Sequence, residues 1–204
     1  MARQRFQIVG ATAGILAVAL FLITFAFHSL RAEDFHPLND YLSKLGSLDQ
    51  NGSASWNISG FVVVGALFAI FGFSFGKFVE DPFSGTCMVC CGVGFAVAAI
   101  PAEMIDEEST LTKAHIVSVC IALASWCFGL ARTGSQSRID SRIRNSANLA
   151  GILTVVPMAG LGLELFPAAI GHRILLLIVF GWTIFICTEL ITKPNKGRLE
   201  NEDA

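Results

Sequence analysis

Long, uninterrupted apolar runs are the feature of this 204-residue chain that most restricts what it can fold into. Each run is roughly 18–22 residues long, and a helix needs about 20 residues to cross the hydrocarbon core of a bilayer. Because a bilayer offers no water to unpaired backbone groups, each run is expected to be helical. The six runs cover about residues 7–28, 57–78, 83–100, 114–131, 147–166 and 174–192.

The composition agrees with a membrane protein. Hydrophobic residues make up 53% of the chain and charged residues 15%, with a mean hydropathy of +0.63, whereas soluble domains average about 25% charged residues. Little sequence is left outside the runs for a soluble domain. We therefore predict an all-α polytopic membrane bundle of six transmembrane helices, in a single domain over residues 1–204, with an outer loop at 29–56 and a disordered tail at 194–204.

The distribution of Lys and Arg predicts the orientation, because cytoplasmic segments of membrane proteins carry an excess of these residues. One side of the predicted bundle holds Arg3, Arg5, Lys77, Arg132, Arg138, Arg142, Arg144, Lys193, Lys196 and Arg198. The other side holds only Arg31, Lys44, Lys113 and Arg173. Both termini are therefore expected in the cytoplasm, in a multi-pass protein of the plasma membrane.

The stretch from residue 100 to residue 115 joins two runs and concentrates ionisable side chains at the predicted outer surface. Glu103 leaves one run and His115 opens the next. The same topology places all four histidines of the chain at that surface, namely His28, His36, His115 and His172. We expect a polar pocket at the outer mouth of the bundle, built from Asn57, Glu103, His115, Glu164, His172 and Arg173.

Two interpretations of this pocket are open. Histidine and carboxylate ligands suit Zn²⁺, and a zinc-bound water serves in hydrolysis, with Glu103 and His115 as candidate catalytic residues. Alternatively, these side chains simply reach water or pair at an interface that tolerates them. The sequence contains no H-E-x-x-H, G-x-S-x-G, P-loop or dinucleotide-binding pattern. The centres of the runs hold no ionisable group except thiols, which argues against ion pumping or proton relay.

Small residues at a four-residue spacing predict close helix contacts. Gly10 and Gly14 in the first run, and Gly72 and Gly76 in the second, would let another helix approach closely. The C-x-x-C-C element at residues 87–91 has the spacing of a metal or redox site. Because it lies within a membrane run with no second pair nearby, we interpret its cysteines as small apolar packing residues.

Local signals refine the outer side of the bundle. Trp56 is expected to anchor the second helix at the lipid–water interface. Asp40 and Lys44 are spaced to pair at i,i+4 in a short interfacial helix after the first run. Ser109 or Thr110 is expected to cap the fourth membrane helix.

A family resemblance rests on five short elements that follow one another along the chain. They are Ser43-Lys44-Leu45-Gly46, Asn57 with Gly60, Pro101-x-Glu103, His115 and His172-Arg173. In these elements the chain resembles the prokaryotic six-helix membrane proteins numbered 998 among the domains of unknown function. It is more distantly similar to the Frag1/DRAM/Sfk1 membrane proteins of eukaryotes. The resemblance covers nearly the whole length.

Two positions depart from the family pattern. Lys44 stands where the family tends to have aspartate, and His172 stands where it tends to have glutamate. A carboxylate-based metal site implied by the resemblance would therefore lose two ligands. The family has no assigned reaction, and its eukaryotic relatives imply a connection with membrane lipids and sterols.

These observations favour a non-enzymatic membrane protein that binds lipid or a partner through its outer face. The alternative is a membrane-embedded hydrolase or transferase that acts on a lipid at that face. Membrane lipids are the expected partners, the glycine-rich helix faces fit a second copy or another membrane protein, and no nucleic acid is expected. We predict no cofactor for the binding protein, and zinc for the enzyme alternative.

Overall fold

The computed structural model describes residues 2–48, 50–103, 109–163 and 165–192, and these residues form helices, turns and loops without a strand. The predicted disordered tail at 194–204 lies outside the described residues. The helices are α1 (Ala2–Ser29), the 3-10 helix η1 (Leu42–Gly46), α2 (Ser53–Trp56), the π-helix η2 (Asn57–Val63), α3 (Val64–Val79), α4 (Pro82–Val97), α5 (Thr110–Ser135), α6 (Ser141–Gly162) and α7 (Ala168–Thr192). Because α2, η2 and α3 continue into one another, they form a single long rod.

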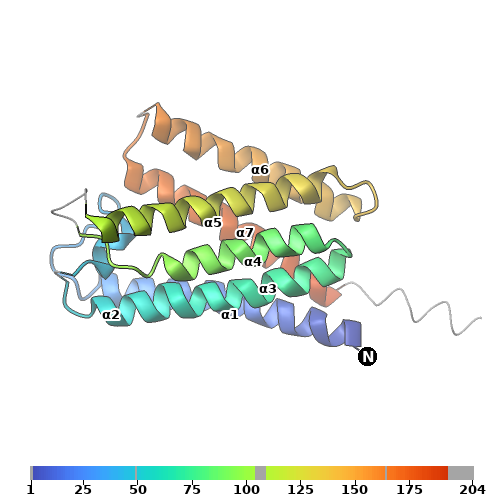
Figure 1. Ribbon diagram of the computed structural model, residues 1–204, viewed down its shortest axis with the longest axis horizontal. Helices are drawn as coiled ribbons and strands as arrows, with labels where there is room; N and C mark the ends of the chain where they lie inside the picture. Colours follow the sequence, from blue (N-terminus) through green and yellow to red (C-terminus); the bar gives the residue numbers. More distant parts are fainter. Residues whose placement is uncertain (1, 49, 104–108, 164, 193–204) are drawn as a thin grey trace, which may run out of the picture.

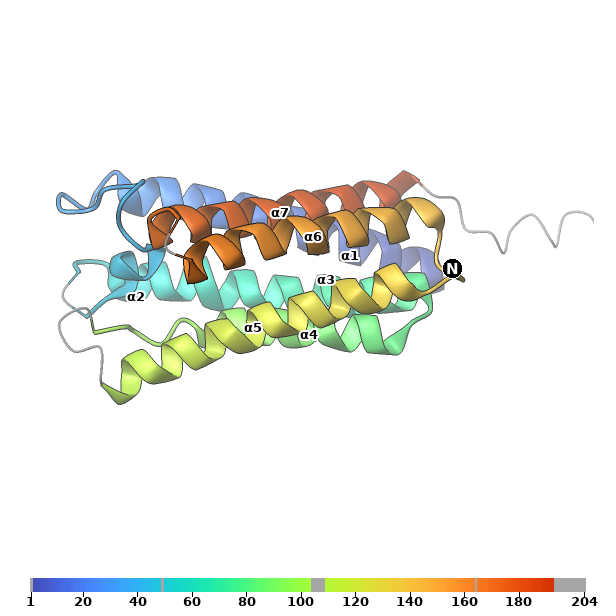
Figure 2. The same cartoon turned by 90° about the horizontal axis from the view of Figure 1, so that it is seen from above.

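In the described part of the chain, six helical rods lie along the long axis of the molecule and close into a ring (Figures 1 and 2). Each rod packs against the next one in chain order, and α1 closes the ring by packing on both α3 and α7. The N-terminus, the α3–α4 turn and the α5–α6 loop share one end of the bundle, here called the terminal end (Figure 1). The opposite end, called the loop end, holds η1, α2 and the first turns of α5 and α7.

Four helices in the described residues are long and apolar enough to cross a membrane. They are Gln4–Ser29, Ser53–Val79, Thr110–Ser135 and Ala169–Thr192. The third predicted run, α4, is apolar but has only 16 residues, which at the helical rise gives about 24 Å against a hydrocarbon core of about 30 Å. The fifth, α6, is less apolar because Asn145 and Asn148 occupy its first half.

Several helices begin earlier than the apolar runs because polar caps, rather than apolar residues, set their first turns. α5 begins at Thr110 after Ser109, whose hydroxyl accepts the N–H of Thr112 at 3.1 Å. Of the two predicted caps, Ser109 is therefore the one used. α6 begins after Asp140, whose carboxylate accepts the N–H of Arg142 at 2.9 Å. The runs thus mark the apolar part of each helix, and the caps mark its start.

Glycines bring neighbouring helices into close contact, as their spacing predicted. A Cβ added at Gly76 of α3 would lie 2.6 Å from the Cα of Gly85 in α4, and one at Gly72 would lie 2.7 Å from the Cβ of Met88. Gly10 of α1 faces Ser74 of α3 in the same way. The contacts lie within the chain, so self-association through glycine faces stays a prediction.

Ionic contacts to a buried carboxylate hold helices together at the terminal end. Asp81, whose side chain is 2% exposed, lies in the α3–α4 turn and caps α4 by accepting the N–H of Ser84 at 3.0 Å. Arg132, near the end of α5, donates to both of its carboxylate oxygens at 3.1 and 3.2 Å, and Arg138 donates at 3.0 Å. Burial alone would raise the pKa of Asp81, but hydrogen bonds from Arg132 and Ser84 hold it well below its ordinary value.

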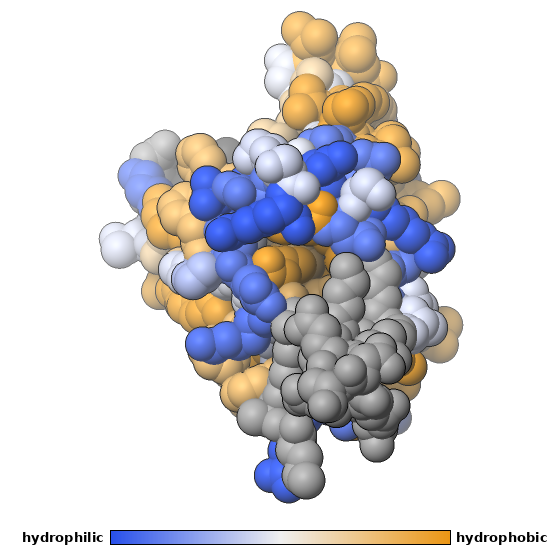
Figure 3. Space-filling view, turned by 90° about the vertical axis from the view of Figure 1, so that its right-hand side faces the viewer, coloured by the Kyte–Doolittle hydropathy of each residue, from blue (hydrophilic) through white to orange (hydrophobic). Residues whose placement is uncertain are grey.

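A second ion pair closes the same end between α6 and α7. Arg142 reaches Glu189, a buried carboxylate of α7, at 3.1 Å. Figure 3 looks onto the terminal end and shows hydrophilic side chains gathered between apolar flanks. Exposed charged residues in the elements that meet there include Arg5, Lys77, Glu80, Arg138 and Arg142. Charged side chains therefore both cover this end and tie its helices together.

Candidate functional site

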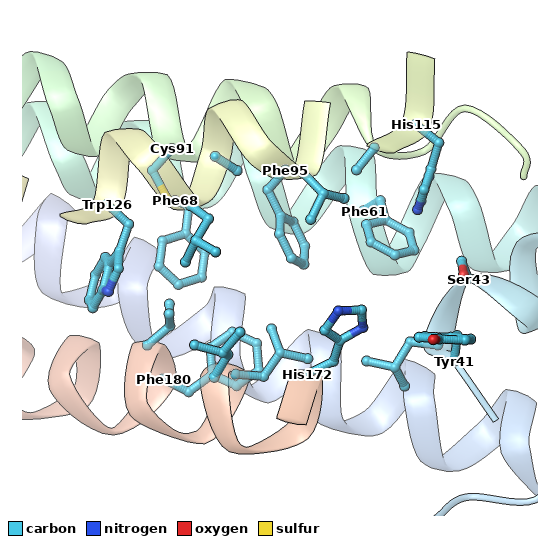
Figure 4. Close-up of a pocket in the computed structure, with 18 residues that line it drawn as sticks. Tyr41, Ser43, Phe61, Phe68, Cys91, Phe95, His115, Trp126, His172 and Phe180 are labelled. Atoms are coloured by element: carbon cyan, nitrogen blue, oxygen red, sulfur yellow. The ribbon is translucent and has the colours of Figure 1, made fainter. Parts of the chain in front are cut away.

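A cavity of about 170 Å³ extends from the loop end toward the middle of the bundle (Figure 4). This exceeds the roughly 150 Å³ that accommodates benzene in an engineered protein cavity, so the space is too large to be a minor packing gap. Its walls are mainly aromatic and aliphatic, including Phe61, Phe68, Phe95, Val119, Ala122, Leu123, Trp126, Leu175, Leu176, Val179 and Phe180. The polar side chains Tyr41, Ser43, His115 and His172 lie toward the loop end in Figure 4.

The cavity separates α5 from α7. Both helices contribute lining residues, together with η1, η2, α3 and α4, whereas the described residues of α6 contribute none. In Figure 2, α5 diverges from α7 toward the loop end, and the cavity occupies the space between these two helices. The cavity therefore lies inside the ring of helices, between α5 and α7.

Two tryptophans close the cavity toward the terminal end. The rings of Trp126 on α5 and Trp182 on α7 meet edge to face, with centroids 5.1 Å apart. Trp126 donates from Nε1 to the hydroxyl of Thr154 at 3.4 Å, and Trp182 donates to the hydroxyl of Ser146 at 3.2 Å. Both acceptors belong to α6, so these hydrogen bonds join α5, α6 and α7 below the cavity.

His115 enters the cavity from the first turns of α5. Its Nδ1 lies 3.1 Å from the carbonyl oxygen of Ile100, in the connection that follows α4. A carbonyl oxygen only accepts, so Nδ1 carries the hydrogen, and in the neutral ring Nε2 is the acceptor. The ring also packs against Phe61, with centroids 6.4 Å apart. His115 is thus held in place through Nδ1, and the backbone of Ala98 also interacts with its ring.

His172 faces the same space from α7, with Tyr41 beside it (Figure 4). The centroids of the Tyr41 and His172 rings are 5.3 Å apart. Ser43 of η1 completes the polar group at this mouth of the cavity. The structure therefore brings two of the predicted site residues, His115 and His172, to one cavity from different helices.

A segment that precedes and includes η1 covers the loop end of the cavity, and side chains from several helices hold it. Arg173 of α7 donates to the carbonyl oxygens of Ala169 at 2.7 Å and Asp40 at 2.8 Å. Asn57 donates to the carbonyl oxygen of Gly46 at 2.9 Å. These two predicted site residues therefore position the segment at residues 40–46, and neither lines the cavity.

Asp40 stabilises the same segment from within. Lys44 pairs with its carboxylate at 2.8 Å, which confirms the i,i+4 pair predicted from the sequence. The backbone N–H of His36 also donates to this carboxylate at 2.8 Å. The His36 and Lys44 hydrogen bonds hold the pKa of Asp40 below its ordinary value.

The two predicted carboxylates occupy different positions in relation to the cavity. Glu103 interacts with Thr112 through its backbone, donating its N–H to the Thr112 hydroxyl at 3.0 Å. Glu103 does not belong to the cavity lining. Glu164 lies outside the described residues. The pairing of Glu103 with His115 as catalytic residues therefore stays a prediction.

No group of three or more His, Cys, Asp or Glu side chains that could hold a metal ion occurs in the described ranges. The six cysteines are free, and only Cys91 and Cys187 are fully buried. The C-x-x-C-C element at residues 87–91 faces several directions around α4, since Cys90 is exposed and Cys87 is half-buried. The zinc alternative therefore has no ligand set among the described side chains.

Sequence reasoning missed Tyr41 and Ser43, and it misplaced Trp56. Trp56 was expected at the lipid interface, but its side chain is fully buried, and its ring packs against Phe21 and Phe61. Aromatic rings of α1, namely Phe25 and His28 as well as Phe21, surround Trp56 and keep it in the interior. Ser43 could have been found, because it belongs to the Ser43–Gly46 element on which the family resemblance rests. Nothing in the sequence singled out Tyr41.

Comparison with known proteins identifies the family. The family described as "Protein of unknown function (DUF998)" matches residues 15–189. The chain therefore belongs to that family, as its five sequence elements predicted. No curated protein and no solved structure matches the chain.

Proposed function

We propose that this DUF998 protein is a non-enzymatic membrane protein that binds a lipid, with one acyl chain in the cavity between α5 and α7. The observation that carries the proposal is the distribution of polarity in that cavity. Its walls are apolar over most of their length, and its polar side chains gather at the loop end. A lipid has the same division between an apolar chain and a polar head group.

The length of the cavity fits an acyl chain. Its lining on α5 runs from His115 to Trp126, which at 1.5 Å per residue is about 16 Å. Half of the hydrocarbon core of a bilayer is about 15 Å. A chain that entered with its head group near His115 and His172 would therefore reach the Trp126–Trp182 contact, about as deep as a chain in one leaflet.

The hydrolase alternative receives less support. It requires Glu103 and His115 to act on a lipid in one pocket, and Glu103 is not a lining residue. A hydrolase of this kind would use a metal-bound water, and the described side chains provide no set of three metal ligands. Binding, in contrast, requires only the shape and the polarity of the cavity.

The proposal includes six membrane spans with both termini in the cytoplasm of a cell-membrane protein. The ten-to-four distribution of Lys and Arg supports this orientation. The packing of α4 between α3 and α5, and of α6 between α5 and α7, supports spans for these two less typical helices. Reporter fusions after residues 80 and 140 should be cytoplasmic, and a fusion after residue 35 should be exported.

Filling the cavity tests the proposed binding directly. Ala122 is buried on α5 and lines the cavity, so Ala122→Leu adds volume where the acyl chain would lie. A leucine there would compete with the acyl chain for the same space, and a cost of about 1–3 kcal/mol corresponds to a loss of roughly five- to 150-fold in lipid affinity. The amount of lipid that co-purifies with each protein would be measured by mass spectrometry after extraction.

Ala124→Leu is the matched control, because Ala124 is an exposed alanine two residues further along the same helix. It should retain as much lipid as the unmodified protein. If Ala122→Leu stays folded, with an unchanged thermal midpoint, and retains as much lipid as Ala124→Leu, the cavity is not the lipid site.

A further inference from the structure

We infer that the lipid in this cavity carries an uncharged, hydroxyl-bearing head group, as in a monoacylglycerol, rather than a phosphate or a carboxylate. This inference rests on the proposed lipid-binding function and specifies its ligand. It follows from the charges and hydrogen-bonding groups around the mouth of the cavity, which differ from those of an anion site.

Cationic side chains are missing from the described lining of the cavity. The lining residues include no Lys or Arg among the residues that the structure describes. Proteins that hold phosphate or carboxylate groups commonly use the paired donors of Arg or the ammonium of Lys. An anionic head group at this mouth would therefore lose its hydration without gaining such a partner.

Two cations that directly follow lining residues in the sequence are already engaged. Arg173 follows His172 directly, but its guanidinium donates to the carbonyl oxygens of Ala169 and Asp40. Lys44 follows Ser43, but its ammonium donates to Asp40 at 2.8 Å and to the carbonyl oxygen of Asp34 at 2.6 Å. Both side chains hold the chain around the cavity through these hydrogen bonds, and neither lines it.

The hydrogen-bonding groups at the mouth match hydroxyl groups. Nε2 of neutral His115 is an acceptor, because Nδ1 donates to Ile100. A ligand hydroxyl can donate to this nitrogen, whereas an ionised carboxylate or phosphodiester offers only acceptors. Ligand selection at this nitrogen therefore depends on a hydrogen that the phosphate or carboxylate group itself does not carry.

Three further side chains can serve the other hydroxyl of a monoacylglycerol. Tyr41, Ser43 and His172 line the mouth, and no hydrogen bond joins their side-chain polar atoms to another described residue. Hydroxyl groups and a neutral imidazole each both donate and accept. A glycerol head group, whose hydroxyls also do both, can satisfy these groups without any charge.

Competition between three ligands with the same saturated acyl chain tests the inference. Radiolabelled monoacylglycerol would be displaced from the purified full-length protein, in detergent micelles at pH 8, by monoacylglycerol, lysophosphatidic acid or free fatty acid. The expected result is that monoacylglycerol binds at least about tenfold more tightly than either anion. Comparable or tighter binding of either anion would overturn the inference and leave lipid binding intact.

His115→Asn tests the hydrogen bond itself. An asparagine amide can still donate to Ile100, because it occupies the position of Nδ1, but it has no group at the position of Nε2. We expect monoacylglycerol affinity to fall by roughly five- to tenfold, the net value of one hydrogen bond, and fatty acid affinity to stay unchanged. The matched control is His36→Asn, an exposed histidine outside the cavity.

The outcomes distinguish a failure of the head-group inference from a failure of the proposed lipid binding. Equal losses for all ligands in His115→Asn, or no loss for monoacylglycerol, would overturn the head-group inference alone. Failure of every chain-bearing ligand to bind the folded protein would overturn the proposed function itself.

Discussion

The two ends of the bundle use polar side chains in opposite ways. At the terminal end, the buried carboxylate of Asp81 is surrounded by donors from the α4 cap, from α5 and from the following loop. At the loop end, polar side chains line a cavity, and His172, Tyr41 and Ser43 have no described hydrogen-bond partner for their side chains. One end pairs a buried carboxylate, and the other leaves three exposed or half-buried polar side chains available.

The difference has an energetic meaning. Buried polar groups usually pair, because an unpaired one retains the cost of its desolvation. Asp81 is buried and paired accordingly, and the Arg142–Glu189 pair and the Trp126–Trp182 contact add further links between helices. Tyr41, Ser43 and His172 are exposed or half-buried, so they do not carry the full desolvation cost of a buried group. The comparison therefore assigns stability to the terminal end and binding to the loop end.

Removing the carboxylate of Asp81 should have the largest effect. Asp81→Ala leaves Arg132, Arg138 and Ser84 without their common acceptor, and we expect a loss of about 3 kcal/mol in stability. Thermal unfolding in detergent micelles would measure it. Asp34→Ala, an exposed aspartate at the loop end, is the control and should be close to neutral. Equal midpoints for the two variants would contradict the assignment of stability to the terminal end.

Acid should weaken the same end of the molecule. The pKa of Asp81 is held below its ordinary value of 3.8, so the ionised carboxylate stabilises the fold above that value and this contribution is lost as the pH falls through the lowered pKa. The thermal midpoint should stay nearly constant from about pH 7 to pH 5 and then decrease below about pH 4.

Asp81→Asn should reduce this acid dependence, because it removes the titrating group. Part of the decrease should persist in the variant, since Asp40 also has a lowered pKa. Thermal unfolding of both proteins at pH 7 and pH 3 would compare them. An equally steep decrease in the variant would show that Asp81 is not the principal acid-sensitive group.

Replacing a polar residue of the cavity should have the smallest effect on stability. His172→Phe keeps a ring of similar shape and removes a polar group that lacks a described hydrogen-bond partner. We expect a gain in stability of less than about 0.5 kcal/mol. Lipid binding should weaken at the same time. A loss of stability comparable to that of Asp81→Ala would remove the contrast between the two ends.

Much of the fold could be predicted from local sequence. The apolar runs located all six rods, and Ser109 and the Asp40–Lys44 pair were predicted because capping and i,i+4 pairing depend on near neighbours. His115 and His172 were predicted to share one surface, because each opens a run that starts at the same end. These features need only the periodicity of a helix and the direction of the chain.

The cavity itself could not be predicted, because it depends on how far α5 and α7 diverge. Phe68, Leu123 and Val179 line it, yet in sequence they resemble any residues that face lipid or pack between helices. Arg173 and Asn57 were predicted as pocket residues from their polarity alone, but each bonds to a backbone carbonyl that only the folded chain brings within reach.

Photolabelling tests the central claim, that the loop-end cavity holds a lipid chain, most directly. A monoacylglycerol with a diazirine in its acyl chain would be bound to the purified protein and crosslinked, and the labelled peptides identified by mass spectrometry. We predict labels on α5 between residues 115 and 126 and on α7 between residues 172 and 180, with both lost in Ala122→Leu. Labels spread evenly over the exposed apolar faces of α1 and α6, and unchanged in Ala122→Leu, would contradict it.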